Sequence, residues 1–260
     1  MKLFALPLAV MCLTACSSLE SVSRLSSFSN ELVPQTKSLR IINVNGDITI
    51  SSLSAHKELN VDVDYFAQAT SIEKANSLIN QLDLQFNYAD GGVAIVEITG
   101  PTSNCGANLI VQIPENINLD IRNSNGDVNV VPLVSAVNVR TINGDVIINS
   151  SDKVRAKTNN GDIVLDGNSA DFDLRSTKGD INLTQSAIFN GSGSMTTTNG
   201  SLRINNSATI DAKIAGSTTH GDYSVYGPPL FANQGAGLIR LSTINGNINI
   251  THVEMPDTVE

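Results

Sequence analysis

Apolar and polar residues alternate in short runs along most of this chain, and the runs recur at fixed positions after a glycine. Two and four residues after each such glycine the side chain is apolar, and the residue between is mostly polar. Such alternation predicts a β-strand with one buried face. An apolar column five residues before most of these glycines predicts a second strand, so each unit is strand, corner, strand. The glycines are Gly46, Gly126, Gly144, Gly161, Gly179, Gly200, Gly221 and Gly246.

The corner distinguishes a hairpin meander from a solenoid. Asn-Gly is typical of two-residue hairpin turns, but a small hydroxyl or amide side chain also stands three residues before each glycine, as at Asn123, Thr158 and Thr218. Such a column gains hydrogen bonds along its length only if equivalent corners stack about 4.8 Å apart. From Gly126 onward the glycines are 17 to 25 residues apart, as in solenoid repeats. The pattern predicts an all-β fold, a single-chain parallel β-solenoid (β-helix), right-handed, of about seven to eight coils.

Residues 55–113 interrupt the repeat. Within residues 70–82, the spacing of Ile72, Ala75 and Ile79 predicts one short amphipathic α-helix, with Thr70 and Glu73 as a capping box. Strand-like runs flank this helix. We therefore expect residues 38–118 to form the first coil plus a helix-containing β cap, residues 119–253 to form the solenoid repeats, and residues 254–260 to be a disordered tail. The longest break in the repeat, residues 226–237, is either a functional loop or a C-terminal cap.

The first residues, "MKLFALPLAVMCLTAC", indicate export. Their apolar run is too short to span a bilayer, and "LTAC" resembles the lipobox of bacterial lipoproteins. That resemblance implies that residues 1–15 are a lipoprotein signal peptide and that Cys16 carries the lipid; an ordinary signal peptide is the alternative. Residues 16–37 are then the lipid anchor and a Ser-rich tether. Serines at 17 and 18 imply export to the outer membrane, in a bacterial cell envelope, facing either the periplasm or the surface.

Composition limits the partners. The formal net charge is −9 and only 4% of the residues are aromatic. An acidic protein is a poor ligand for nucleic acid, whose phosphates require clustered Lys and Arg. With residues 1–15 removed and Cys16 acylated, only Cys105 remains, so no internal disulfide can form. We expect a membrane held through the lipid anchor and an envelope protein or glycan as partners, and no cofactor.

The order of helix, Pro114 and repeated "NGD[IV]" carries a more specific resemblance. With the strand pair around "DGGVAIVEI" and the run "VQIPENINLDIRNSNGDVNV", residues 38–253 resemble the bacterial "putative adhesin" β-solenoid family of domains of unknown function. The resemblance implies an envelope β-solenoid. It brings no established catalytic residues.

Two charged columns flank the corner. The acidic column follows the glycine directly: Asp127, Asp145, Asp162 and Asp180. The basic column stands four residues before the glycine: Arg122, Arg140, Lys157 and Arg175. Stacked carboxylates suggest calcium, but the nonapeptide of calcium-binding β-rolls is missing from the sequence. We instead predict that the columns neutralise each other across the corner, or that the aspartates bind turn amides, and we expect no metal site.

The remaining chemistry favours binding over catalysis. Ile142, Ile147 and Val164 face outward on adjacent coils and form either a small docking patch or an aliphatic ladder under a neighbouring loop. The three histidines are too scattered to form a metal triad or a nucleophile–base pair. We therefore expect no catalytic residues and no enzymatic activity, but a structural or interaction role, adhesin-like or scaffolding. The alternative is a polysaccharide-binding or glycan-cleaving enzyme on a β-helix.

Overall fold

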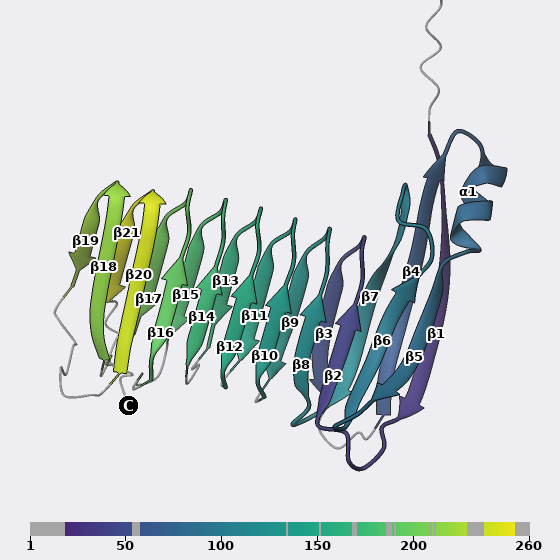
Figure 1. The fold of residues 1–260 in the computed structure, drawn as a ribbon, viewed down its shortest axis with the longest axis horizontal. Helices are drawn as coiled ribbons and strands as arrows, with labels where there is room; N and C mark the ends of the chain where they lie inside the picture. Colours follow the sequence, from purple (N-terminus) through teal and green to yellow (C-terminus); the bar gives the residue numbers. More distant parts are fainter. Residues whose placement is uncertain are drawn as a thin grey trace, which may run out of the picture.

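A computed structural model describes residues 19–53, 58–133, 135–150, 152–167, 171–185, 189, 191–207, 210, 212–227 and 237–252. The expected signal peptide, Cys16 and the tail at 254–260 lie outside the described residues, as do residues 228–236 of the long break. The described chain contains one helix, α1, and strands β1 to β21 (Figure 1).

The elements follow one another in a regular series. Their bounds are β1 (Glu20–Glu31), β2 (Ser38–Ile42), β3 (Ile48–Leu53), β4 (Glu58–Ala69), α1 (Ile72–Ile79), β5 (Asp83–Ala89), β6 (Val93–Thr99), β7 (Cys105–Pro114), β8 (Asn118–Arg122), β9 (Val128–Leu133), β10 (Val137–Arg140), β11 (Val146–Ser150), β12 (Val154–Lys157), β13 (Ile163–Asp166), β14 (Phe172–Arg175), β15 (Ile181–Gln185), β16 (Gly193–Thr196), β17 (Leu202–Asn206), β18 (Ala212–His220), β19 (Tyr223–Tyr226), β20 (Gly237–Asn245) and β21 (Ile248–His252).

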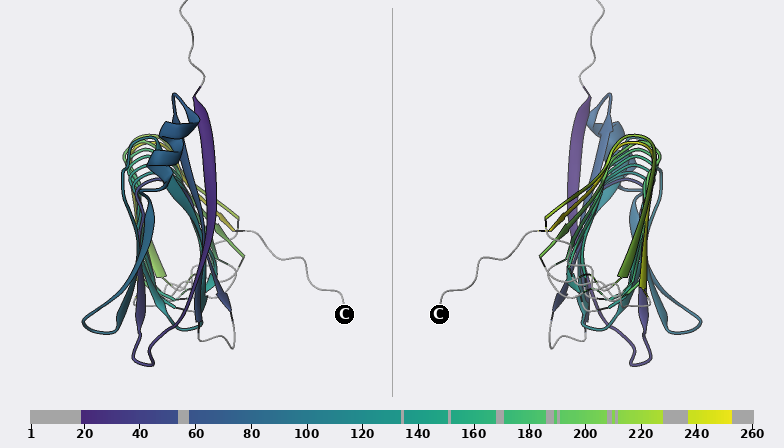
Figure 2. Two further views of the ribbon diagram at one scale, coloured as in Figure 1. Left: turned by 90° about the vertical axis from the view of Figure 1, so that its right-hand side faces the viewer. Right: turned by 90° about the vertical axis from the view of Figure 1, so that its left-hand side faces the viewer.

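The strands form two sheets that face each other across the core. Sheet A has the order β1-β4-β7-β3-β9-β11-β13-β15-β17-β21-β19, and sheet B has the order β18-β20-β16-β14-β12-β10-β8-β2-β6-β5. Viewed along the long axis, the coils overlie one another (Figure 2). Equivalent residues pair in register and in parallel; Val146 pairs with Ile163, and Ile163 with Ile181. The prediction of an all-β, parallel, in-register architecture is confirmed, and a hairpin meander is excluded for the repeats.

Both ends of the stack depart from chain order. The coil β2–β3 lies between β6–β7 and β8–β9, because β2 pairs with β6 and β8, and β3 pairs with β7 and β9. At the other end, β20–β21 lies between β16–β17 and β18–β19. The coil containing Gly221 is therefore the last in space, although the coil containing Gly246 is the last in sequence.

The terminal position of β18–β19 explains an exception in the apolar columns. Tyr223 and Val225, expected to be buried, are each 46% exposed because no described coil covers them. Gly216 stands where the other coils carry an apolar residue. A Cβ added there would lie 2.2 Å from the ring of Tyr223, so the missing side chain makes room for that ring.

The N-terminal cap contains the predicted helix, with two corrections. Ser71, not Thr70, is the N-cap, and its hydroxyl accepts a hydrogen bond from the Lys74 amide at 3.4 Å. Ala75 and Ile79 are buried, as expected, whereas Ile72 is 52% exposed. Helix α1 packs against β1 and β4, which pair antiparallel at the edge of sheet A.

The predicted tether is wrong for residues 20–31, which form strand β1. All twelve residues pair with β4. Two contacts fix the strand: the rings of Phe28 and Phe86 lie 5.2 Å apart, and the Arg24 guanidinium stacks on Tyr65 at 4.5 Å. The serines conceal this strand in the sequence because one face of an edge strand is open to solvent and needs no apolar residues.

The corners are stacked at very close range. A Cβ added to Gly161 would lie 2.1 Å from the carbonyl oxygen of Gly144 in the preceding coil, and φ at Gly161 is +152°. Equivalent distances of 2.0 to 2.3 Å recur along the stack at the other corner glycines from Gly126 onward. Only a residue without a side chain allows two corners to approach this closely.

The buried column before the glycine fastens each corner to its neighbour. Thr158, fully buried, donates its hydroxyl hydrogen to the Gly144 carbonyl at 3.1 Å, and Ser176 donates to Gly161 at 2.9 Å. Equivalent hydrogen bonds to the corner-glycine carbonyl of an adjacent coil are donated by the hydroxyls of Thr197, Thr243 and Thr218 and by the side-chain amide of Asn123. These side chains were expected to bond to each other along the column; they bond instead to the glycine carbonyl of the adjacent coil.

We expect Gly161→Ala to lower the free energy of unfolding by about 3 kcal/mol or more, because the methyl group meets the Gly144 carbonyl and the backbone is strained. Gly91→Ala is the control: Gly91 also has positive φ, +83°, but no atom lies within 4 Å of its added Cβ. The control should cost about 1 to 2 kcal/mol. Urea unfolding of both variants measures the difference, and equal costs would contradict the close-approach explanation.

A second pair of variants isolates the hydroxyl bond. Thr158→Val keeps the side-chain shape but leaves the Gly144 carbonyl without its donor, and should cost about 1 to 2 kcal/mol. Thr141 occupies the same column and is buried, but its hydroxyl has no hydrogen-bond partner among the described residues. Thr141→Val should therefore be neutral or stabilising. Thermal melts followed by circular dichroism provide the comparison; a loss at Thr141 as large as that at Thr158 would refute this role for the hydroxyl.

Candidate functional site

The aspartates that follow the corner glycines form a ladder of hydrogen bonds along the axis. Each carboxylate oxygen Oδ1 accepts from the backbone amide of the equivalent residue in the next coil. The amide of Asp145 donates to Asp127 at 2.8 Å, that of Asp162 to Asp145 at 2.8 Å, and that of Asp180 to Asp162 at 2.7 Å. Of the two arrangements expected, the geometry shows aspartates bound to turn amides.

The ladder continues through neutral residues in the same column. The Ser201 amide donates to Asp180 at 2.8 Å, and the Asp222 amide donates to the side-chain oxygen of Asn247 at 2.9 Å. The Ser201 hydroxyl in turn accepts from the Asn247 backbone amide at 3.3 Å. Asn and Ser therefore perform the same task as Asp, so a negative charge is not required for it. The aspartates stabilise the corners as hydrogen-bond acceptors. They are therefore not the ion-pair partners of the basic column.

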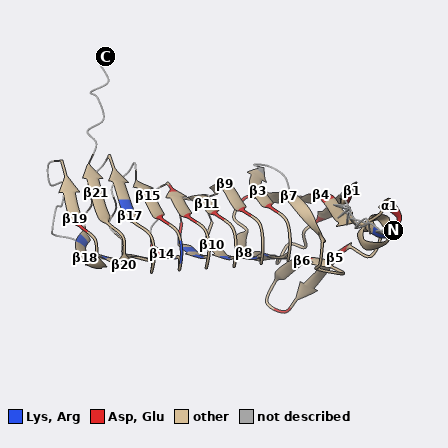
Figure 3. Cartoon of the chain, turned by 90° about the horizontal axis from the view of Figure 1, so that it is seen from above, with Lys and Arg blue, Asp and Glu red and all other residues tan. Residues whose placement is uncertain are grey.

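The basic column lies on the other side of the corner, on the outer face of sheet B. Figure 3 shows Lys and Arg along the β8, β10 and β14 side and Asp and Glu along the β9, β11 and β15 side. The expected neutralisation across the corner is therefore wrong for this column. Arg122 pairs with Asp120 at 3.2 Å, and Arg175 with Asp173 at 2.8 Å, each two residues back on its own strand. The corner separates the two columns because the aspartates are directed along the axis to the next coil.

Two members of the basic column keep their charge unpaired. Arg140 and Lys157 are exposed register partners on β10 and β12, and no ion pair joins either to an acid within the described residues. Arg155, two residues before Lys157 on the same face, is equally exposed and unpaired. Like charges about 5 Å apart repel by about 0.8 kcal/mol in water. This cluster is therefore held in place by the fold at an electrostatic cost.

Asp173, the register partner of Arg155 on β14, forms its hydrogen bonds with other residues. Its Oδ1 accepts from Arg175 at 2.8 Å and from the Ser194 hydroxyl at 2.6 Å. Burial raises the pKa of Asp173, but these hydrogen bonds, together with the nearby positive charges of Arg175 and Arg155, outweigh burial and bring the pKa below its usual value. Asp173 is thus ionised at neutral pH and bound to Arg175, not to Arg155.

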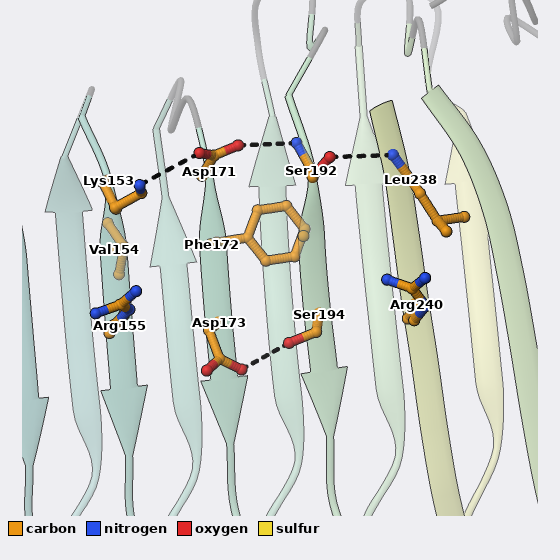
Figure 4. Close-up of a pocket in the computed structure, with 11 residues that line it drawn as sticks. Lys153, Val154, Arg155, Asp171, Phe172, Asp173, Ser192, Ser194, Leu238 and Arg240 are labelled. Carbon is orange, nitrogen blue, oxygen red and sulfur yellow. Dashed lines mark hydrogen bonds and ion pairs between the residues drawn. The ribbon is translucent and has the colours of Figure 1, made fainter. Parts of the chain in front are cut away.

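Two shallow grooves follow this face. One, of about 290 Å³, is lined by Arg140, Arg155, Lys157 and Arg175, with Asn138 and Asp173. The other, of about 300 Å³, extends toward β20 and is lined by Arg155, Asp173, Ser192, Ser194 and Arg240 among others. In Figure 4, Arg155 and Arg240 stand on either side of Asp173 and Ser194. The grooves share Arg155 and Asp173, so they form one continuous depression along the axis.

Sequence reasoning missed Arg155 and Arg240. They belong to the column six residues before the glycine, which also holds Asp120, Asn138 and Asp173. Because this column has no uniform character, it gives no signal along the chain. Only the stacking of β12 beside β10 places Arg155 next to Arg140 and Lys157.

The aliphatic residues singled out in the sequence are divided between two places. Ile147 and Val164 are register partners on the outer face of sheet A, whereas Ile142 lies in the corner before β11. Ile142 and Ile147 are 47% and 45% exposed, and Val164 is half-buried. Asn129 and Asn182 flank the pair on adjacent strands, which confines the aliphatic run on sheet A to two rungs. The docking role of these residues stays a prediction.

Other reactive groups are isolated. Cys105 is buried, its thiol donates to the Pro101 carbonyl at 3.1 Å, and burial raises the pKa of that thiol. Within the described residues, no three His, Cys, Asp or Glu side chains are grouped as metal ligands. Nor does the described part of the chain contain a helix with the length and hydropathy of a membrane span.

The acid dependence of stability should report on Asp180. Burial alone would raise the pKa of Asp180. Hydrogen bonds from the Ser201 amide and from Arg203, the latter at 2.7 Å, lower the pKa by more than burial raises it, so the pKa lies below its usual value. The resulting stabilisation is complete above the unfolded pKa of about 3.9 and is lost as pH falls through the folded pKa. Asp180→Asn keeps the amide acceptor but loses the ion pair.

We therefore expect Asp180→Asn to lower the melting temperature near pH 7 and to converge with the unmodified chain as the pH falls through the lowered pKa of Asp180. Thermal melts across this range measure the convergence. Asp90→Asn, in the exposed turn between β5 and β6, controls for the loss of one negative charge. A constant offset at Asp180 over the whole range would show that its charge does not stabilise the fold.

Several solved structures are similar to this chain at low sequence identity. A putative adhesin from Bacteroides fragilis is 15% identical, with a TM-score of 0.44, covering 88% of this chain and 97% of that one. A putative cell adhesion protein from Clostridium sporogenes is 13% identical, with a TM-score of 0.39, covering 88% and 100%. A putative lipid binding protein from Parabacteroides distasonis is also 13% identical, with a TM-score of 0.39, covering 88% and 97%. No curated protein matches the chain.

These structural scores are too low to support an argument about ligands. A family model, by contrast, matches residues 33–251, which run from β2 into β21 and include helix α1 but not β1. The match confirms the resemblance drawn from the helix, the proline and the repeated Asn-Gly-Asp corners. The chain belongs to the Toastrack DUF4097 family, a family of domains of unknown function.

Proposed function

We propose that this chain is a lipid-anchored protein of the bacterial cell envelope with a non-catalytic role in binding or scaffolding. The observation that carries the binding role is the outer face of sheet B, where stacked coils present charged and polar side chains at one strand spacing over a continuous depression. The solenoid has about seven to eight coils and winds right-handed in this proposal.

The fold suits the presentation of a repetitive surface. Each coil is joined to the next by in-register backbone pairing in both sheets and by the corner ladder. Such a stack keeps side chains on neighbouring strands about 4.8 Å apart. A partner with its own repeat, an envelope glycan or protein, can therefore make the same contact several times. Nucleic acid is not an expected partner, because the chain as a whole is acidic.

The lipid anchor would hold the cap end close to the membrane. Cys16 stands four residues before the start of β1 at Glu20. Four residues extend at most about 14 Å. Because β1 begins at Glu20, the lipid would lie closer to the fold than a tether reaching residue 37 would allow. The outer membrane is the proposed location, on either face. Firm anchoring requires more than one acyl chain, as in bacterial lipoproteins.

We expect the unmodified chain to incorporate labelled palmitate and to fractionate with the outer membrane, and Cys16→Ser to do neither. Cys105→Ser, a change at a buried thiol, is the control and should keep both properties. Affinity capture from intact envelopes, compared between these two variants, then tests for partners that depend on anchoring. An unlabelled wild-type chain would indicate an ordinary signal peptide and refute the lipoprotein assignment.

A further inference from the structure

The strongest unassigned feature of the molecule is a row of cations along the depression on sheet B. Arg140, Lys157, Arg155 and Arg240 make up this cationic strip. All four are exposed, and none makes an ion pair within the described residues. They occupy strands β10, β12 and β20, with β14 and β16 between. The strip therefore spans five adjacent strands, or about 19 Å at about 4.8 Å per strand.

The acids near the strip are already bound. Asp120 accepts from Arg40 at 2.7 Å and from Arg122, and Asp173 accepts from Arg175 and Ser194. Lys153 and Asp171 pair with each other at 3.6 Å. The corner aspartates lie on the other side of the fold, bound to amides of the next coil. An acidic protein thus displays a local row of cations without contact ion pairs among the described residues; Asp173 attracts Arg155 at longer range but forms its close contacts with Arg175 and Ser194.

The side chains around the strip indicate what kind of anion fits. Asn138, Ser192 and Ser194 line the same two grooves and place small polar groups between the cations. The side chain of each already makes one hydrogen bond within the protein, and its oxygen can accept a further one from a ligand hydroxyl. The one aromatic residue lining them, Phe172, is buried. Strips that bind single-stranded nucleic acid combine cations with exposed aromatic rings on which bases stack. Cations interspersed with hydroxyl and amide groups instead match a polymer with carboxylates and hydroxyls.

The shape of the strip points to an extended ligand. The two grooves are shallow and continuous, and they run along the axis across the strands. One sugar ring of an extended polysaccharide advances by a distance comparable to one strand spacing. A chain of about four acidic sugars could therefore place successive carboxylates along the strip. A bilayer is flat and would not use the depression.

We propose that the cationic strip binds an acidic polysaccharide, a chain of uronic acid type, lying along the solenoid axis. This inference rests on the proposed binding role and names the partner of the same surface. Arg140, Lys157 and Arg155 form its core, and Arg240 extends it. Arginine pairs with carboxylates through two parallel hydrogen bonds, which gives orientation as well as attraction.

Titration calorimetry with polygalacturonate at low salt tests the proposal on residues 17–260, which retain every described residue without the lipid. The triple variant Arg140→Gln, Arg155→Gln, Lys157→Gln should bind at least ten-fold more weakly. The matched control carries Lys37→Gln, Lys74→Gln and Arg203→Gln, three cations that do not line the grooves, the last on β17 of sheet A, and should bind like the unmodified chain. Circular dichroism melts verify that both variants fold.

Further ligands separate the sources of an electrostatic signal. Tetragalacturonate should bind and galacturonate alone should bind at least ten-fold more weakly, because a monomer contacts one rung. Neutral dextran and phosphatidylglycerol vesicles should not show binding that the triple variant removes.

Three results would overturn the inference: no binding of polygalacturonate by the unmodified chain, equal loss in the triple variant and its control, or vesicle binding that depends on the strip. Because this assay contains no membrane anchor or envelope extract, its failure would leave the capture experiment and the lipid labelling of the proposed function to be judged separately.

Discussion

The close stacking of one glycine corner on the next is the constraint on which the rest of this structure depends. The carbonyl oxygen of each corner glycine occupies the space that a side chain on the next glycine would need. At most corners that same carbonyl also accepts a hydrogen bond from a Thr or Ser hydroxyl of an adjacent coil, as Gly144 does from Thr158. Contact and hydrogen bond reinforce each other, because the hydroxyl reaches the carbonyl only when no Cβ holds the corners apart.

The corner also determines how charge is distributed over the surface. An acceptor after the glycine is required to receive the amide of the next coil, and Asp most often provides it. The aspartates are therefore directed along the axis, and the cations before the corner are directed outward from sheet B. The net charge of −9 conceals this separation. Surface chemistry on sheet B is consequently a by-product of the way in which the corners are stabilised.

The exposed strand edges are covered differently at the two ends of the stack. At the N-terminal end, antiparallel strands β1, β4 and β5 and helix α1 cover the last parallel coil. At the other end, the chain places β18–β19 outermost and returns to insert β20–β21 beneath it. Insertion gives β20 and β21 neighbours on both sides, whereas Tyr223, Val225 and Tyr226 remain exposed on the outermost coil.

The sequence by itself determined the repeating unit, the parallel stacking and the helix in the cap, because each leaves a regular pattern along the chain. Only the tertiary structure decided that residues 20–31 are a strand, since their partner β4 lies far along the chain. It also decided the order of the terminal coils and the position of Arg155 beside Arg140 and Lys157. Strand pairing that lies outside the repeat or departs from chain order determines these features, and the periodicity along the chain does not show where such pairing occurs.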